Sequence, residues 1–210
     1  MIDCACSGEH RDAKRVVLTG GPGAGKTAVL EVLARSLCRH IVVLPEAAGI
    51  VYGGGFPRRD GAAFRRASQR AIFRVQEELE RAFMEDGSYA VLLCDRGLVD
   101  GLAYWPGSAR EFLDDLGRSE EALFARYAAV IHLRTPLAGH GYDHRNPLRT
   151  ETAMEAAAID TRILEAWAGH PKRIVVESTH DFLDKVRRVV ELVRAELPAC
   201  CASHRIALTP

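Results

Sequence analysis

The sequence predicts an α/β protein in three layers, with a parallel sheet between two layers of helices. Five short apolar runs are separated by longer stretches in which apolar residues recur every three or four positions. The first pattern is typical of buried parallel strands and the second of amphipathic helices. Because the two patterns alternate, we expect the crossover helices to cover both faces of the sheet. The apolar runs lie at residues 15–19, 41–44, 89–94, 128–133 and 173–176.

The length and charge indicate a single neutral domain. The chain has 210 residues and a formal net charge of zero, which disfavours a nucleic-acid partner. No apolar run approaches the roughly 18 residues of a membrane span, and the N-terminus lacks the apolar region of a secretion signal. We therefore expect a cytoplasmic protein with no membrane partner. Whether the protein forms a homodimer is left open by the sequence. The domain is expected at residues 15–197, between a flexible N-terminal tail at 1–14 and a C-terminal tail at 198–210.

A glycine-rich segment lies between the first strand and a helix expected at residues 28–37. It matches G-x-x-x-x-G-K-S/T, the phosphate-binding loop. Glycines let backbone N–H groups surround an anion, and the helix N-terminus adds about half a positive charge. We expect Lys26 to reach the β- and γ-phosphates of ATP and the Thr27 hydroxyl to bind Mg²⁺. The residues expected to hold the nucleotide are Gly20, Gly21, Pro22, Gly23, Ala24, Gly25, Lys26, Thr27 and Ala28.

Two other interpretations of this segment are weaker. A plain glycine-rich turn with a solvated Lys26 is disfavoured, because the motif lies between a predicted strand and a predicted helix, which is the context that a phosphate-binding loop requires. A dinucleotide-binding G-x-G-x-x-G, counted from Gly21, puts Lys26 in the place of the third glycine.

Acidic residues follow the second and third strands. Glu46 comes after the strand that Pro45 stops, and Asp95-Arg96 comes after the third strand. In open α/β sheets, ligands bind at the carboxyl ends of the strands. An apolar strand followed by Asp is typical of the magnesium-associated element of loop-type NTPases, so we expect Asp95 to share Mg²⁺ with Thr27. A plain ion pair between Asp95 and Arg96 is the alternative.

A long helix is predicted at residues 62–85. Its apolar residues recur at helical spacing and predict one buried stripe, which consists of Phe64, Ala67, Ala71, Val75, Leu79 and Ala82. Arginines dominate its start and glutamates its end, and we expect most of these charges to pair on a solvated face. The alternative is that one or two arginines between residues 58 and 74 bind an anionic substrate.

A long exposed loop is predicted at residues 135–150 from its glycines, prolines and polar residues. Folded over a nucleotide, this lid would exclude water, and Arg145 and Arg149 would bring positive charge to the transferring phosphoryl group. Thr150 is the expected N-cap of the helix that follows the lid. The other expected helical segments lie at residues 100–105, at a polar region up to about 127, at 150–168 and at 181–197.

Six cysteines are scattered through the chain, namely Cys4, Cys6, Cys38, Cys94, Cys200 and Cys201. Cys94 lies in an apolar strand and is expected to be a small core residue. A zinc or disulfide clip between the cysteines of the two tails stays open, although the spacings match no common metal pattern. Free thiols in a reducing cytoplasm are favoured.

These residue types suit phosphoryl transfer. That reaction requires positioned phosphates, a metal ion, a group that holds the acceptor hydroxyl, and cations around the moving γ-phosphoryl group. We expect Glu46 or Asp95 to orient or deprotonate the acceptor. The predicted catalytic set is Lys26, Glu46, Asp95, Arg96, Arg145 and Arg149.

Residues 18–27 (LTGGPGAGKT), 44–48 (LPEAA) and 94–100 (CDRGLVD), together with the arginines of the lid, carry a resemblance. The chain resembles the AAA-type ATP-binding proteins related to the ribosylnicotinamide kinase domain and, more distantly, the deoxynucleoside and thymidylate kinases. The resemblance covers residues 15–196 and implies the strand order 2-3-1-4-5.

The resemblance also implies roles for several residues. It places Glu46 against the acceptor and Asp95-Arg96 beside the γ-phosphate. It implies that Ser178 and Thr179 lie near adenine, and that Gln69 or Gln76 contacts a substrate base.

The function that follows is an ATP- and Mg²⁺-dependent kinase acting on a small molecule, with a nucleoside-like acceptor most favoured. One alternative is a regulatory protein that binds or hydrolyses NTP and acts on a protein partner. The other is a polynucleotide-end kinase that uses the arginines between residues 58 and 74.

Overall fold

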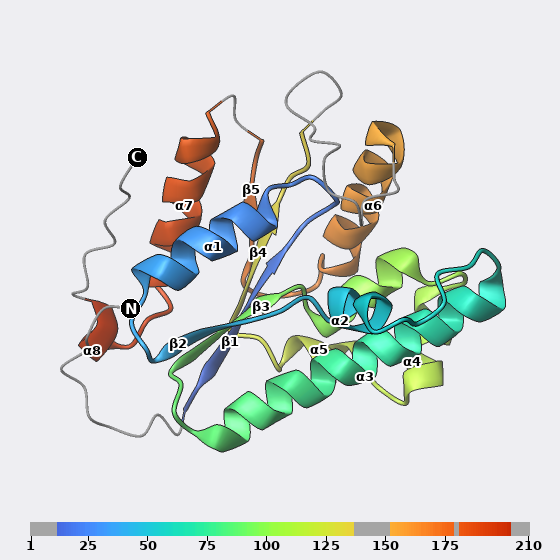
Figure 1. Ribbon diagram of the computed structural model, residues 1–210, viewed down its shortest axis with the longest axis horizontal. Coiled ribbons are helices and arrows are strands. Elements are labelled where there is room, and N and C mark those ends of the chain that lie inside the picture. Colours follow the sequence, from blue (N-terminus) through green and yellow to red (C-terminus); the bar gives the residue numbers. More distant parts are fainter. Residues whose placement is uncertain (1–11, 137–151, 179–180, 203–210) are drawn as a thin grey trace.

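Five parallel strands form one sheet in the order β2-β3-β1-β4-β5, as the sequence predicts (Figure 1). The computed structural model describes residues 12–136, 152–178 and 181–202. Within those ranges, no helix combines the length and the apolar character needed to cross a membrane. The strands are β1 (Lys14–Thr19), β2 (Ile41–Leu44), β3 (Val91–Asp95), β4 (Ala129–Leu133) and β5 (Arg173–Val176).

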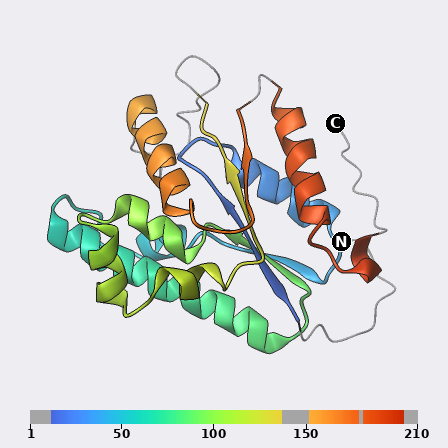
Figure 2. The same cartoon turned by 180° about the vertical axis from the view of Figure 1, so that it is seen from behind.

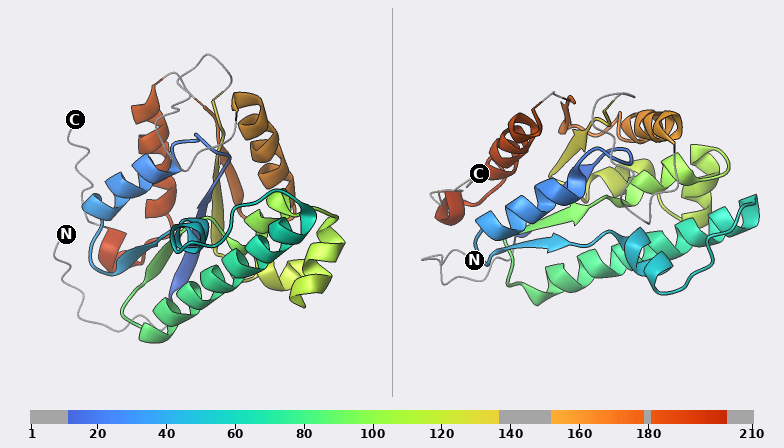
Figure 3. Two further views of the ribbon diagram at one scale, coloured as in Figure 1. Left: turned by 45° about the vertical axis from the view of Figure 1, so that its right-hand side comes forward. Right: turned by 45° about the horizontal axis from the view of Figure 1, so that its top comes forward.

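Helices cover both faces of the sheet (Figures 2 and 3). One face carries α1 (Lys26–Ser36) and α7 (Phe182–Arg194), and the other carries α3 (Ala62–Asp86) and α6 (Ala153–Ala166). Val16 and Leu18 of β1 pack with the first pair, while Val17 between them packs on the opposite side. Successive side chains of a strand point to opposite faces, so both faces must be apolar, and this explains the continuous apolar runs in the sequence.

Shorter elements extend the connections at the carboxyl edge of the sheet. The seven-residue α2, which the sequence did not predict, begins directly after Glu46. The segment predicted at residues 100–105 is a 3-10 helix, and the polar region that follows it forms two short helices. These elements are α2 (Ala47–Gly53), η1 (Leu98–Tyr104), α4 (Ala109–Leu116) and α5 (Glu120–Phe124).

The bounds predicted for α3 are confirmed to within a residue, but the stripe predicted to be buried is wrong. Phe64 is 36% exposed and Ala82 is also exposed. The buried face instead carries Ser68, Gln69, Phe73, Gln76 and Glu80. Glu80 is tolerated there because its carboxylate accepts hydrogen bonds from Arg126 Nη2 at 2.8 Å and from the Tyr127 hydroxyl at 2.7 Å. Partners distant in the sequence therefore decide which face of α3 turns inward.

Two predicted helix boundaries also change. The N-cap of α6 is Thr152 rather than Thr150, because Thr152 and Glu155 form a reciprocal capping box. Part of the predicted C-terminal tail is a short helix, α8 (Ala199–Ala202), in which Cys201 is only 1% exposed.

Candidate active site

The phosphate-binding loop joins β1 to α1 in the predicted strand–loop–helix arrangement. Gly20 and Gly25 have φ angles of 135° and 91°, a region that favours glycine. A Cβ on Gly20 would lie 2.0 Å from the carbonyl oxygen of Leu133, so no other residue fits there. Gly25 directly precedes α1 as its N-cap, and this points the first amides of the helix into the loop.

Lys26 lies folded back within the loop. Its Nζ donates to the carbonyl oxygens of Gly20 at 2.9 Å and Gly21 at 3.1 Å. Burial, together with the nearby positive charge of Arg96, lowers the pKa of this ammonium group to about 8. An anionic phosphate in the loop would favour the charged form, so the loop is suited to an anion.

The strand-end residues predicted from the sequence meet at one edge of the sheet. Asp95 is the last residue of β3, and Glu46 follows β2, which pairs with β3 in parallel. Arg96 joins them to the loop, since its Nε lies 2.5 Å from Glu46 Oε1 and its Nη1 donates to Gly20 O at 3.2 Å. Within the described residues Arg96 also pairs with Asp100 and not with Asp95, so a plain Asp95–Arg96 ion pair is not formed.

The two carboxyl groups have opposite pKa shifts. Burial raises the pKa of Asp95 to about 6, and one of its oxygens, Oδ1, has no hydrogen-bond partner among the described residues. Burial acts in the same direction on Glu46, but the positive charges of Arg96 and Lys26 outweigh it and lower the pKa. Glu46 is therefore ionised at neutral pH, while Asp95 lacks the partner that would stabilise its charge.

A pocket of about 240 Å³ lies in front of these groups. Its phosphate side is lined by Lys26 and the exposed Thr27. Its far side is lined by residues from α2, α3, η1 and the connection before α3, among them Tyr52, Arg58, Gln69, Phe73, Gln76 and Tyr104. Thus the loop and both acids open into a compartment that the long helix closes on one side.

Three arginines of α3 lie in surface ion pairs, whereas Arg58, in the connection before α3, lies at the pocket. Arg65, Arg70 and Arg74 form ion pairs with Asp60, Asp115 and Glu77 on the surface, as predicted for a solvated face. Arg58 differs because it lines the pocket and lies 5.2 Å from the ring centre of Tyr52.

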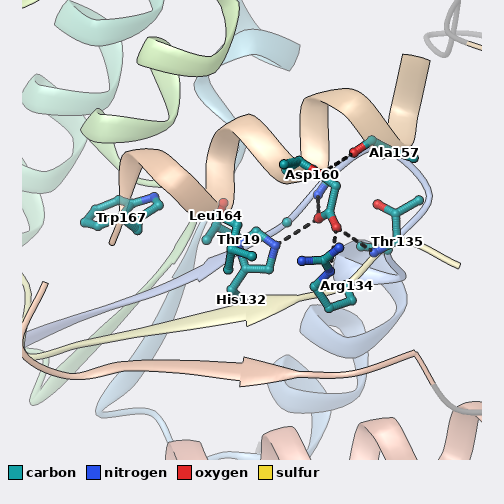
Figure 4. A network of polar contacts seen from close by, with 12 residues as sticks. Thr19, His132, Arg134, Thr135, Ala157, Asp160, Leu164 and Trp167 are labelled. Carbon is teal, nitrogen blue, oxygen red and sulfur yellow. Dashed lines mark hydrogen bonds and ion pairs between the residues drawn. The ribbon is translucent and has the colours of Figure 1, made fainter. Parts of the chain in front are cut away.

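A role for Asp160 of α6 was not predicted from the sequence, yet its carboxylate binds the backbone of the phosphate-binding loop (Figure 4). Its Oδ1 accepts from the backbone N–H of Gly21 at 2.8 Å and from Nε2 of the buried His132 at 2.9 Å. Its Oδ2 lies 2.9 Å from Arg134 Nε and accepts from the Thr135 N–H at 3.3 Å. A carboxylate with four donors remains ionised, and although burial raises its pKa, these hydrogen bonds lower it below the usual value.

Asp100 is the second residue that sequence reasoning missed as part of the site. Its Oδ2 accepts from the Thr19 hydroxyl at 2.5 Å, and its Oδ1 accepts from the indole N–H of Trp167 at 2.5 Å. With Arg96 at 3.4 Å, this carboxylate ties the end of β1 to η1 and to the end of α6. The signal was present in the segment DRGLVD, but its role depends on partners up to 81 residues away.

Several predicted site residues fall in parts of the chain that are not described. Arg145, Arg149 and Thr179 lie outside the described residues, as does most of the predicted lid. Ser178 is described and is exposed after β5. Their roles in binding and catalysis remain predictions.

The sequence profile of an AAA domain family matches residues 15–185. The chain belongs to this AAA domain family. The match covers the strand–loop–helix motif, both strand-end acids and α6, and it confirms the AAA-type resemblance drawn from the sequence. No similar sequence was found among curated proteins.

Two solved structures share the fold of this AAA domain. The thymidylate kinase from Candida albicans matches with a TM-score of 0.61 and 13% identity, over 88% of this chain and 92% of that chain. The NadR protein, solved in complex with NR, matches with a TM-score of 0.67 and 16% identity over 89% of this chain. The chain spans only 52% of the NadR chain. At these identities the likeness concerns the fold, which is that of a P-loop kinase.

The raised pKa of Asp95 predicts that this residue destabilises the free protein. Between about pH 4 and pH 6 the unfolded chain loses the Asp95 proton before the folded chain does, so stability falls as pH rises through this window. We expect Asp95→Asn to raise the free energy of unfolding by up to about 3 kcal/mol near pH 7.5 and by about half as much near pH 5. Urea unfolding at both pH values measures this gain.

The control for this measurement is Asp114→Asn, which changes an exposed aspartate of α4 and should leave stability nearly unchanged. An equal gain from Asp95→Asn at both pH values would show that ionisation of Asp95 is not the cause.

Proposed function

We propose that this AAA domain transfers the γ-phosphoryl group of ATP to a hydroxyl group of a small, nucleoside-like molecule. One observation carries the proposal: the phosphate-binding loop, two strand-end acids and a compartment that α3 closes on one side share a single pocket. A hydrolase acting on water needs no such compartment, whereas a kinase needs room for an acceptor beyond the last phosphate. The membership in the AAA domain family and the kinase-like fold support an enzyme of the kinase or ATPase kind.

The phosphate side suits a metal–nucleotide complex. Mg²⁺ prefers oxygen ligands, and both Thr27 and Asp95 line this pocket. Thr27 is exposed, and Asp95 has a buried oxygen, Oδ1, without a hydrogen-bond partner among the described residues. These two residues would hold the ion, which when bound offsets charge on the phosphate oxygens. Lys26 would move from the loop carbonyls to the β- and γ-phosphates, and the loop amides would hold the phosphates.

The acceptor side suits a hydroxyl compound with a planar base. Glu46 is ionised and stands between the loop and the compartment, so it can hold the acceptor hydroxyl and accept its proton late in transfer. Phe73 offers an aromatic face, and Gln76 Oε1 is buried without a hydrogen-bond partner among the described residues. A base that donates to this oxygen would satisfy it. Gln69 lines the same wall.

Positive charge for the transferring group would come from Arg96, which is held at the edge of the loop by Glu46 and Gly20 O. We further propose that Arg145 and Arg149 of the predicted lid add to it on closure. Ser178 and Thr179 would lie near the adenine ring, as the family resemblance implies.

The polynucleotide-end kinase is less well supported. Arg65, Arg70 and Arg74 are paired with carboxylates, and this reduces the positive charge that the start of α3 offers to a phosphate backbone. A regulatory NTPase remains the second candidate. It differs from a kinase in that a protein partner, rather than a small hydroxyl compound, would stimulate its ATP turnover.

The test is a screen for ADP release with ATP and Mg²⁺ in the presence of nucleosides, vitamins and sugars. We expect at least one nucleoside-like compound to raise the rate above that with water alone and to appear as its monophosphate by mass spectrometry. A rate that no small hydroxyl compound changes, and that a protein partner raises, would contradict the kinase proposal and favour the regulatory NTPase.

Lys26→Ala should reduce phosphoryl transfer by at least about 100-fold, because the charge that stabilises the transferring phosphates is lost. Steady-state kinetics with ATP measure the change. Lys172→Ala removes a half-exposed lysine that pairs with the buried Glu196 far from the pocket. Because Glu196 keeps Lys14 as a second partner at 3.7 Å, this variant should keep normal turnover. Unchanged turnover in Lys26→Ala would refute the assignment of the loop.

Glu46→Gln should lower turnover by roughly 100-fold or more while leaving ATP affinity nearly unchanged. The amide keeps the size of the side chain but cannot accept a proton. Turnover and ATP titration of the same preparation separate the two effects. A parallel loss of ATP binding would assign Glu46 a structural role through its contact with Arg96.

A further inference from the structure

Three potential metal ligands, two thiols and one imidazole, meet at the amino-terminal edge of the sheet, away from the pocket. Cys38 and His40 lie in the turn between α1 and β2, and Cys201 lies in α8, which packs beside this turn (Figure 1). All three residues are buried, with exposed fractions of 2%, 5% and 1%. The turn is one full helix, α1, away from the phosphate-binding loop, a distance of about 16 Å for eleven residues at about 1.5 Å each.

The donor atoms form a nearly equilateral triangle. The two sulfurs are 3.4 Å apart, and each lies 3.8 Å from Nδ1 of His40. Tetrahedral Zn²⁺, with bonds of about 2.3 Å to sulfur and about 2.0–2.1 Å to nitrogen, separates two sulfurs by about 3.8 Å and a sulfur from a nitrogen by about 3.6 Å. The point in the plane of the three donors that is equidistant from them lies about 2.1 Å from each. Because a zinc–sulfur bond is about 2.3 Å long, an ion at normal bond lengths would lie slightly above this plane.

Hydrogen bonds fix the backbone at each of the three residues. The carbonyl oxygen of Cys38 accepts from Ile41 N at 3.1 Å, which closes the turn. The carbonyl oxygen of His40 accepts from Ala90 N at 2.7 Å and so fastens the turn to the start of β3. Cys201 N donates to Pro198 O at 2.9 Å in the first turn of α8. Donors fixed in this way lose little conformational entropy on binding a metal.

We propose that Cys38, His40 and Cys201 bind one structural Zn²⁺ ion that fastens α8 to the turn between α1 and β2. Two thiolates and a neutral imidazole cancel the charge of the ion, which allows a buried site. Binding releases the two thiol protons, so the affinity rises with pH. The three donors leave one tetrahedral position for water or a further donor. The site is separate from the pocket and does not depend on the phosphoryl-transfer proposal.

A disulfide between Cys38 and Cys201 is the competing chemistry. It would bring the sulfurs to about 2.05 Å and would not involve the imidazole nitrogen. The almost equal distances from His40 Nδ1 to both sulfurs point instead to a common centre.

The first experiment measures zinc in the full chain, purified without a metal-binding tag and dialysed against metal-free buffer. We expect one zinc per chain by elemental mass spectrometry. Cys38→Ser and Cys201→Ser should lose it, whereas Cys94→Ala, which changes a buried cysteine of β3 outside the cluster, should retain it. Zinc retained in both serine variants, or absent from the wild-type chain after incubation with Zn²⁺, would overturn the proposal.

The second experiment needs no variant, and so it holds even if the serine variants fail to fold. Co²⁺ exchanged into the wild-type chain should show thiolate-to-metal absorption and the strong visible bands of a tetrahedral site. Removing zinc with a chelator should lower Tm by roughly 5–10 °C, and added Zn²⁺ should restore it. A weak octahedral cobalt spectrum, or the loss of two titratable thiols together with a mass lower by two hydrogens, would overturn the proposal in favour of an adventitious ion or a disulfide.

Discussion

The active-site edge of this protein depends on the position of Arg96. It is the one non-glycine residue with a positive φ angle, 72°, within the described parts of the chain. Such a conformation costs roughly 1–3 kcal/mol and persists only where surrounding contacts enforce it. Here the Arg96 amide donates to Leu18 O at 3.1 Å, and the guanidinium group contacts Glu46, Gly20 O and Asp100. One strained residue thereby joins the ends of β1, β2 and β3.

The free site has features that oppose stability and suit an anionic ligand. Lys26 is buried with a depressed pKa, and Asp95 is buried with a raised one. A protein selected only for stability would replace such groups or pair them fully. Phosphates beside Lys26 would raise its pKa, and a cation beside Asp95 would lower the pKa of that carboxyl group, so both would favour the charged forms. Both shifts have burial as their largest cause, so a ligand of opposite charge would offset each of them.

Sequence reasoning recovered the elements that local pattern controls. The five strands, their order, the loop and the strand-end positions of Glu46 and Asp95 follow from apolar runs, glycine spacing and a family resemblance, and the structure agrees on all of the geometry. It failed on the buried face of α3, where polar residues such as Glu80 are satisfied by Arg126 and Tyr127, partners that lie 46 and 47 residues away. It also missed α2 and placed the cap of α6 at Thr150 rather than Thr152.

The sequence by itself therefore determined the fold class, the anion-binding loop and the acids that follow the strands, because each is encoded by neighbours within one element. The tertiary structure alone decided how Asp160 reaches Gly21 across 139 residues and how Cys201 meets Cys38 across 163. A carboxylate or thiol carries no local sign of its partner. Its role is set by which elements the packed core brings together, and that is a property of the whole sheet and its two layers of helices.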